Sequence, residues 1–309
     1  FMNNLKKVGL TALATTLVAS SAYAGELSVS GSASLNYSGL STNSDTNPYT
    51  MGDSVKFNGS GDLDNGMSVS VYYELDGGNF DDMSLSLGLG DGMGTLGFSG
   101  TSTSPGGVDS VKDIVPTAYT AVYENTNAVD NGLATISGRN QTGMWGYKNS
   151  VGDVAISVGY NTKNSTAHMD PEASVGLTYT GVDGLTLVAG RLDDGLVAES
   201  DTYGVKYVMG SMTAALQKTK VNYDATGTND QDATHYGISV AVNDNLSVSA
   251  GRQVVDIDTA ADDETNTGVN ASYTMGSITI AGGFNEVDSA GGASDADVEV
   301  TMLNVSFAF

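Results

Sequence analysis

The chain has 309 residues and a formal net charge of −24, from 36 acidic and 12 basic residues. This acidic balance argues against nucleic acid as a partner, because binding of phosphate requires a basic surface. The chain contains no cysteine, which excludes disulfide bonds and any cysteine-based metal or redox site.

The first 24 residues have the pattern of a secretory signal peptide. Lys6 and Lys7 precede the apolar run 8–19, and the small-residue motif "AYA" follows at 22–24. We therefore expect cleavage before Gly25. A transmembrane helix is the alternative, but the run is shorter than the roughly 20 apolar residues that span a bilayer. Without this segment, ten basic and 36 acidic residues leave a net charge of −26.

From residue 26 onward, the sequence consists of short stretches in which apolar and polar residues alternate, bounded by Gly, Asn and Asp. A period of two predicts strands whose two faces have unlike surroundings. Sixteen strands are predicted, over residues 26–37, 53–63, 66–75, 82–89, 93–100, 142–149, 152–162, 174–180, 185–192, 201–209, 211–219, 234–242, 246–254, 267–275, 277–285 and 298–309.

The connections between these strands are alternately short and long. Tight turns such as "DNG" at 64–66 and "GVDG" at 181–184 alternate with longer polar loops. A soluble β-sandwich would have mixed Greek-key crossings. Short turns at one end and long loops at the other are typical of an up-and-down outer-membrane barrel with an apolar exterior and a polar lumen. The sequence thus predicts an all-β, transmembrane, antiparallel β-barrel over residues 25–309.

The C-terminal stretch "LNVSFAF" indicates how the barrel closes. Phe309, Phe307, Val305 and Leu303 fall on one face of a strand. A backbone in hydrocarbon must satisfy its hydrogen bonds internally, so a sheet in a membrane has to close on itself. We expect the last strand to pair with the first, with Phe309 in the interfacial aromatic girdle.

Three stretches resemble the general porins of Gram-negative bacteria. They are "VKFNGSGDLDNGMSVSVYYEL" at 55–75, "GLGDGMGTLGF" at 88–98 and "GRNQTGMWGYKNSVGDVAISVGY" at 138–160. The terminal Phe309 is similar to the signal that the barrel-insertion machinery reads in that family. The resemblance implies a sixteen-stranded homotrimer in the bacterial outer membrane, in contact with lipid and lipopolysaccharide, whose long third loop folds into the lumen.

The connection over about 101–141 is the longest in the chain, and a connection of this length is unusual unless it has a function. Within it, "SPGGVDS" at 104–110 resembles the tip of the porin constriction loop. The alternative is an outward loop whose acids lie in solvent. The resemblance implies that the acids of this loop face the pore, and the candidates are Asp109, Asp113, Glu124 and Asp130.

The porin family also sets a basic cluster, usually three arginines, opposite those acids. Arg139 stands at one matching position, whereas Ser54 and Gly100 stand at the other two. The alternation makes Lys56 and Lys148 candidate inward cations. A transverse field needs both signs across the lumen, so a depleted basic wall predicts preference for cations.

Two arginines do not fit the alternation. Arg191 and Arg252 end the similar strands "LTLVAGR" and "LSVSAGR", in phase with leucines that face lipid. A charge on the lipid face costs little only near an interface. We interpret both as outer-rim or subunit-contact arginines, and a bulge that turns them inward is the alternative.

The predicted outer loops are rich in acids, whose oxygens are the ligands that Ca²⁺ and Mg²⁺ prefer. None has the complete Asp-x-Asp-x-Asp-Gly loop with its distal Glu, so a solvated acidic rim is the simpler interpretation and no cofactor is predicted. The weak candidates for a metal site are Asp230, Asp232, Asp262, Asp263 and Glu264.

Catalysis is not predicted. The two histidines, His168 and His235, each lie near a long loop, and no Gly-x-Ser-x-Gly or comparable nucleophile frame is present. We expect a porin that passes small hydrophilic solutes and ions by passive diffusion, with preference for cations. The alternatives are a surface or adhesion barrel with a plugged lumen and a solute-specific channel on the same fold.

Overall fold

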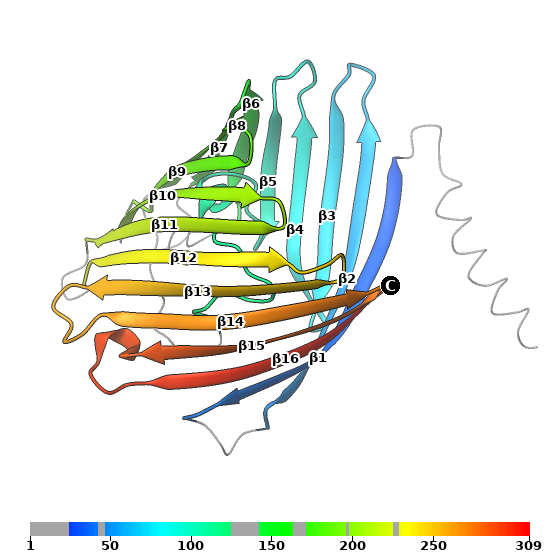
Figure 1. Cartoon of the computed structure of the whole chain (residues 1–309). Coiled ribbons are helices and arrows are strands. Elements are labelled where there is room, and N and C mark those ends of the chain that lie inside the picture. Colours follow the sequence, from blue (N-terminus) through cyan, green and yellow to red (C-terminus); the bar gives the residue numbers. More distant parts are fainter. Residues whose placement is uncertain (1–24, 43–46, 125–141, 163–170, 196–197, 225–228) are drawn as a thin grey trace, which may run out of the picture.

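The computed structural model describes residues 25–42, 47–124, 142–162, 171–195, 198–224 and 229–309. Within them, sixteen strands form one closed antiparallel barrel (Figure 1). The strands are β1 Glu26–Leu40, β2 Tyr49–Asp62, β3 Ser68–Asp76, β4 Asn79–Gly88, β5 Thr95–Thr101, β6 Trp145–Val151, β7 Val154–Asn161, β8 Glu172–Val182, β9 Leu185–Asp193, β10 Ala198–Met209, β11 Met212–Tyr223, β12 Gln231–Ala241, β13 Leu246–Ile257, β14 Glu264–Met275, β15 Ile278–Asp288 and β16 Val298–Ala308. Two short 3₁₀ helices, η1 Val108–Val111 and η3 Ala290–Gly292, lie in the connections.

Every strand pairs with its neighbours in sequence, and β1 also pairs with β16. The prediction of sixteen antiparallel strands and of closure by the last strand is confirmed. In the closing ladder, Ala33 lies opposite Phe307, and the Phe309 N–H donates to the Gly31 carbonyl at 2.9 Å. Among the described residues, no helix has the length and apolar character of a helical membrane span.

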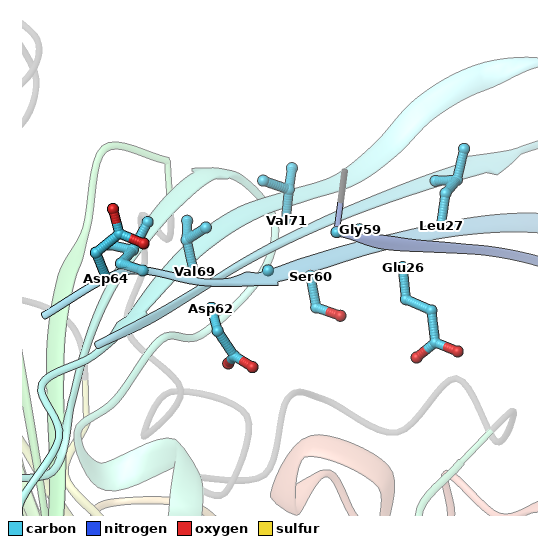
Figure 2. A pocket seen from close by; sticks show the side chains of 11 residues that line it. Glu26, Leu27, Gly59, Ser60, Asp62, Asp64, Val69 and Val71 are labelled. Carbon is cyan, nitrogen blue, oxygen red and sulfur yellow. The ribbon is translucent and has the colours of Figure 1, made fainter. Parts of the chain in front are cut away.

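The two faces of the barrel differ as the alternation predicts. Large apolar side chains lie exposed on the outer face, including Trp145 (47% exposed) and Phe307 (45%). The opposite, inner face carries buried polar side chains such as Gln217 and Asn285. Figure 2 shows the same division where β1 and β2 run side by side, with Glu26 and Asp62 on the side of the sheet away from Leu27. Apolar residues outside and polar residues inside are what lipid around a watery lumen requires.

Two expectations about the outer connections are wrong. The β3–β4 connection is a tight turn at Gly77 and Gly78, whose positive φ angles (55° and 83°) favour glycine, and not a longer loop. Two acids assigned to outer loops, Asp232 and Glu264, also lie within strands. These strands continue past the apolar segment, where the outer face no longer needs apolar residues, so the alternation ends before the hydrogen-bonded ladder does.

Candidate pore constriction

Residues 102–124, which follow β5 and include η1, are called the inner loop here. Their backbone forms hydrogen bonds with side chains on the inner face of β7, β8, β11, β13, β14 and β15. The bonds join Gly107 N to Ser157 Oγ (2.9 Å), Val108 N to Ser174 Oγ (3.3 Å), Ile114 N to Gln217 Oε1 (3.1 Å), Ala118 N to Ser249 Oγ (2.8 Å), Asn270 Nδ2 to Thr120 O (3.1 Å) and Asn285 Nδ2 to Ala121 O (3.0 Å). These contacts seat the inner loop along the wall, strand after strand.

Apolar packing holds the same segment. Val108, Val111 and Ile114 of the inner loop form a buried cluster with Val188 and Leu192 on the inner face of β9. Each of these five side chains is less than 10% exposed, and burying one valine or leucine contributes roughly 1.5–3 kcal/mol. The cluster is therefore a small core between the inner loop and the wall.

Glycines make room for this core. On β5–β10 and β12–β14, an added Cβ at one inner-face glycine per strand would meet inner-loop atoms at 3.2 Å or less. Cross-strand pairs such as Gly146 with Gly159 and Gly176 with Gly190 show that neighbouring strands place glycine at matching heights. We call this row the glycine groove, and it comprises Gly97, Gly146, Gly159, Gly176, Gly190, Gly204, Gly237, Gly251 and Gly268.

The sequence analysis missed the glycine groove. Its signal was a glycine recurring on the polar face of consecutive predicted strands. A side chain at any of these positions would occupy the space of the inner loop, so the groove determines where the inner loop can lie.

The acids of the inner loop differ in their partners. Asp109 Oδ1 lies 2.9 Å from Lys112 Nζ, whereas Asp113 Oδ2 lies 3.9 Å from the same atom. The sequence analysis did not single out Lys112. Tyr123 Oη donates to Asp113 Oδ1 at 3.1 Å. Burial, and then the neighbouring Asp113 carboxylate, raise the pKa of Tyr123, so the phenol stays protonated and keeps this bond. Glu124 is exposed and has no ion pair among the described residues.

His235 lies in β12 on the inner face, opposite Gln217 and Gln253. It is 4% exposed, and its ring centroid lies 5.6 Å from that of Tyr123. The position of this histidine under the inner loop depends on strand register, which is why the sequence did not indicate it. Three other predicted residues, Asp130, Arg139 and His168, lie outside the described residues and stay predictions.

The predicted inward lysines both lie on the inner face. Lys56 is opposite Glu74 in the β2–β3 ladder, with 3.4 Å between Nζ and Oε1, and the Ser54 hydroxyl also donates to Oε1 at 2.6 Å. Glu74, which the sequence analysis did not identify, therefore compensates the charge of Lys56. Lys148 is opposite Ser157 and lines an open cavity of about 540 Å³. In the part of the chain that the structure describes, Lys148 forms no ion pair.

Arg191 and Arg252 both lie on the outer face. Arg191 is opposite Asp201 in an unbroken β9–β10 ladder, and Arg252 is opposite Tyr236 in an equally regular one. This regular register leaves no bulge to turn either side chain inward. Arg191 is half exposed and pairs with Glu199 (2.6 Å) and Asp201 (3.2 Å), which offsets its charge at the strand end.

The weak metal candidates have other partners. Asp230 Oδ1 accepts from Tyr223 N, and Asp232 lies 3.5 Å from Lys218 Nζ. Glu264 is 1% exposed and accepts from Gly291 N (2.7 Å) and Asn266 Nδ2 (2.8 Å). Its assignment to a solvated rim is wrong, because it satisfies the backbone of η3. No three His, Cys, Asp or Glu side chains converge on a cation position in the described ranges, which include Asp262 and Asp263.

Comparisons with known proteins agree with this architecture. A family model described as "Gram-negative porin" matches residues 9–309. A porin structure refined at 1.8 Å resolution aligns with 92% of this chain and 100% of its own, at a TM-score of 0.73 and 20% identity. The anion-selective porin from Comamonas acidovorans aligns over 92% and 100% (TM-score 0.66, 14% identity). OmpT of Vibrio cholerae, in its trimer form, aligns over 93% and 100% (TM-score 0.70, 14% identity). A search of curated protein sequences finds no match.

Proposed function

Because the chain belongs to the Gram-negative porin family, we propose that its barrel is a water-filled pore for passive diffusion of small hydrophilic solutes and ions. Membership of this family makes the chain a channel protein of the bacterial outer membrane, and neither the family nor the fold is that of an enzyme. The main structural support for this proposal is the path of the inner loop along the inner face of the barrel. Hydrogen bonds and an apolar core hold residues 102–124 against the inner face from β7 to β15, which supports a constriction of the lumen and not a loop that lies outside the barrel.

The charges of the described residues support preference for cations. The inner loop carries Asp109, Asp113 and Glu124 against the single cation Lys112, a net charge of −2. On the wall, Glu74 compensates Lys56, whereas Lys148 forms no ion pair among the described residues, so a loop charge of −2 stands against this one lysine. In a lumen with low-dielectric walls, uncompensated carboxylates raise the local concentration of cations and repel anions. The compared Comamonas acidovorans porin is described as anion-selective, so selectivity has to come from each chain's own side chains.

The proposed function also includes assembly into a homotrimer in the outer membrane. One compared structure is described as a trimer form, and we place this chain in a homotrimer whose outer face contacts outer-membrane lipid and lipopolysaccharide. The C-terminal strand ending at Phe309, which closes the barrel against β1, is the segment we assign to recognition by the insertion machinery.

A planar-bilayer measurement tests the function. The refolded barrel is inserted, and conductance steps are recorded in KCl, followed by the reversal potential across a KCl gradient. We expect large, open steps and a reversal potential on the cation side. Stable insertion without steps would favour the plugged surface barrel, and an anion-selective reversal would overturn the charge argument alone.

A further inference from the structure

A cavity of about 370 Å³ lies between the inner loop and β12. Its volume is at the small end of the roughly 300–1,000 Å³ found for ligand pockets. His235 is the lining residue that comes from the wall, and the inner loop contributes Asp113, Tyr119, Tyr123 and Glu124. We call it the His235 cavity.

Anchors on both sides hold the His235 cavity open. Gln217, opposite His235 on β11, accepts from Ile114 N (3.1 Å) and donates to Val111 O (2.9 Å). On β13, Ser249 accepts from Ala118 N (2.8 Å). The inner loop is thus fixed to the wall on both strands that flank β12, and these contacts set its position over His235.

His235 is a buried polar group that the described part of the chain leaves without a partner. Its Nε2 atom is buried and forms no hydrogen bond there, and the ring meets Tyr123 edge to face. A buried donor or acceptor without a partner costs roughly 1–3 kcal/mol, so polar groups in such positions are usually satisfied by water or by a ligand. The position therefore favours a guest that can form hydrogen bonds.

The two carboxylates of the cavity favour a ligand with a positive charge. Asp113 and Glu124 both line the cavity, are exposed on its open side, and have no cation closer than 3.9 Å among the described residues. Two carboxylates repel anions. A bare divalent ion is disfavoured because it needs a larger set of ligands, and no group of three is found in the described ranges. The faces of Tyr119 and Tyr123 can contact an organic cation.

We propose that the His235 cavity is a binding subsite for small organic cations that carry a protonated amine. The ammonium group binds between Asp113 and Glu124 and also donates a hydrogen bond to Nε2 of His235, and the carbon chain lies against Tyr119 and Tyr123. This inference rests on the proposed function, because it places the subsite on the path of diffusing solutes. It makes the pore a selective filter for amines in addition to its general preference for cations.

The test uses butylammonium chloride as the probe and sodium butyrate as its anionic counterpart of equal chain length. Block of the KCl current is titrated in planar bilayers, and binding is measured independently by calorimetry on the detergent-solubilised barrel. We expect saturable block and saturable heat with butylammonium and neither with butyrate. In the double variant Asp113→Asn, Glu124→Gln, the half-blocking concentration should rise at least about tenfold, since a hydrogen bond to a charged group contributes roughly 1.5–3 kcal/mol.

The control variant is Asp109→Asn, which removes an inner-loop carboxylate that pairs with Lys112 and does not line the cavity. It should change the reversal potential and leave the half-blocking concentration within about twofold. The subsite proposal is wrong if block does not saturate, or if the double variant has the same half-blocking concentration as the unmodified protein. Conductance steps in KCl would still support the pore function in that case. If no conductance steps appear in KCl, the proposed pore function is wrong. Calorimetry with butylammonium then tests the binding subsite independently of the pore.

Discussion

Seating of the inner loop in the glycine groove gives the sharpest prediction, through the substitution Gly146→Ala. The added Cβ would lie 2.4 Å from the Pro105 carbonyl carbon and 2.6 Å from Gly106 N. These are backbone atoms, so a rotamer change cannot relieve the overlap. Ordinary van der Waals contact begins at 3.4 Å, which means that the inner loop must move away from the wall by about 1 Å.

The expected cost of this overpacking is about 1–3 kcal/mol of unfolding free energy. Gly59→Ala is the matched control, because it is also a strand glycine and no atom lies within 4 Å of its added Cβ. That variant should be neutral or gain up to about 1 kcal/mol, since glycine weakens a strand. Displacement at Gly146 pushes the inner loop toward the lumen, so single-channel conductance should fall in Gly146→Ala only.

Both effects can be measured. Urea unfolding of the barrel in lipid vesicles is followed by the fluorescence of Trp145, the only tryptophan, which lies on the outer face. Conductance is recorded in planar bilayers for each variant. If Gly146→Ala and Gly59→Ala show the same unfolding midpoint and the same conductance, the inner loop is not seated in the glycine groove.

Three further predictions follow from single contacts. Glu74→Gln removes the ion-pair partner of Lys56 and should shift the reversal potential toward anions, whereas an unchanged potential would place this pair outside the conducting path. Arg191→Ala should leave conductance unchanged and lower the unfolding free energy by at most about 1 kcal/mol, because its ion pairs are exposed; a change in conductance would contradict its outer position. Glu264→Ala should cost about 1–3 kcal/mol by leaving Gly291 N–H without its acceptor, and calorimetry should show no change in Ca²⁺ binding.

The strands that form the wall of the barrel could be predicted from local sequence. Alternation in stretches such as 67–75 involves residues two apart, and the surroundings of a strand's two faces impose it directly. Sixteen strands, their antiparallel order and closure against β1 followed, because a sheet in lipid cannot leave an open edge. Errors arose where that local signal ends, at Gly77–Gly78 and at Asp232, since glycine turns and strand ends outside the hydrocarbon do not need apolar residues.

The pairing of functional residues depended on register instead. Glu74 meets Lys56, and His235 meets Tyr123, only because particular positions of separate strands and of the inner loop come to equal heights. A shift of one residue would turn each wall side chain to the other face. Resemblance brought Asp109, Asp113 and Glu124 forward as candidates, but it did not indicate which of them has a compensating cation.

The sequence by itself determined that this protein is a transmembrane barrel with an acidic character, because the constraints of lipid and water repeat in every strand. The tertiary structure alone decided where the inner loop lies and which carboxylates stay uncompensated. Those outcomes rest on contacts such as Ile114 with Gln217 and Thr120 with Asn270, which join residues more than 100 positions apart. No local pattern encodes such contacts, because they arise only when the closed barrel brings the glycine groove and the inner loop together.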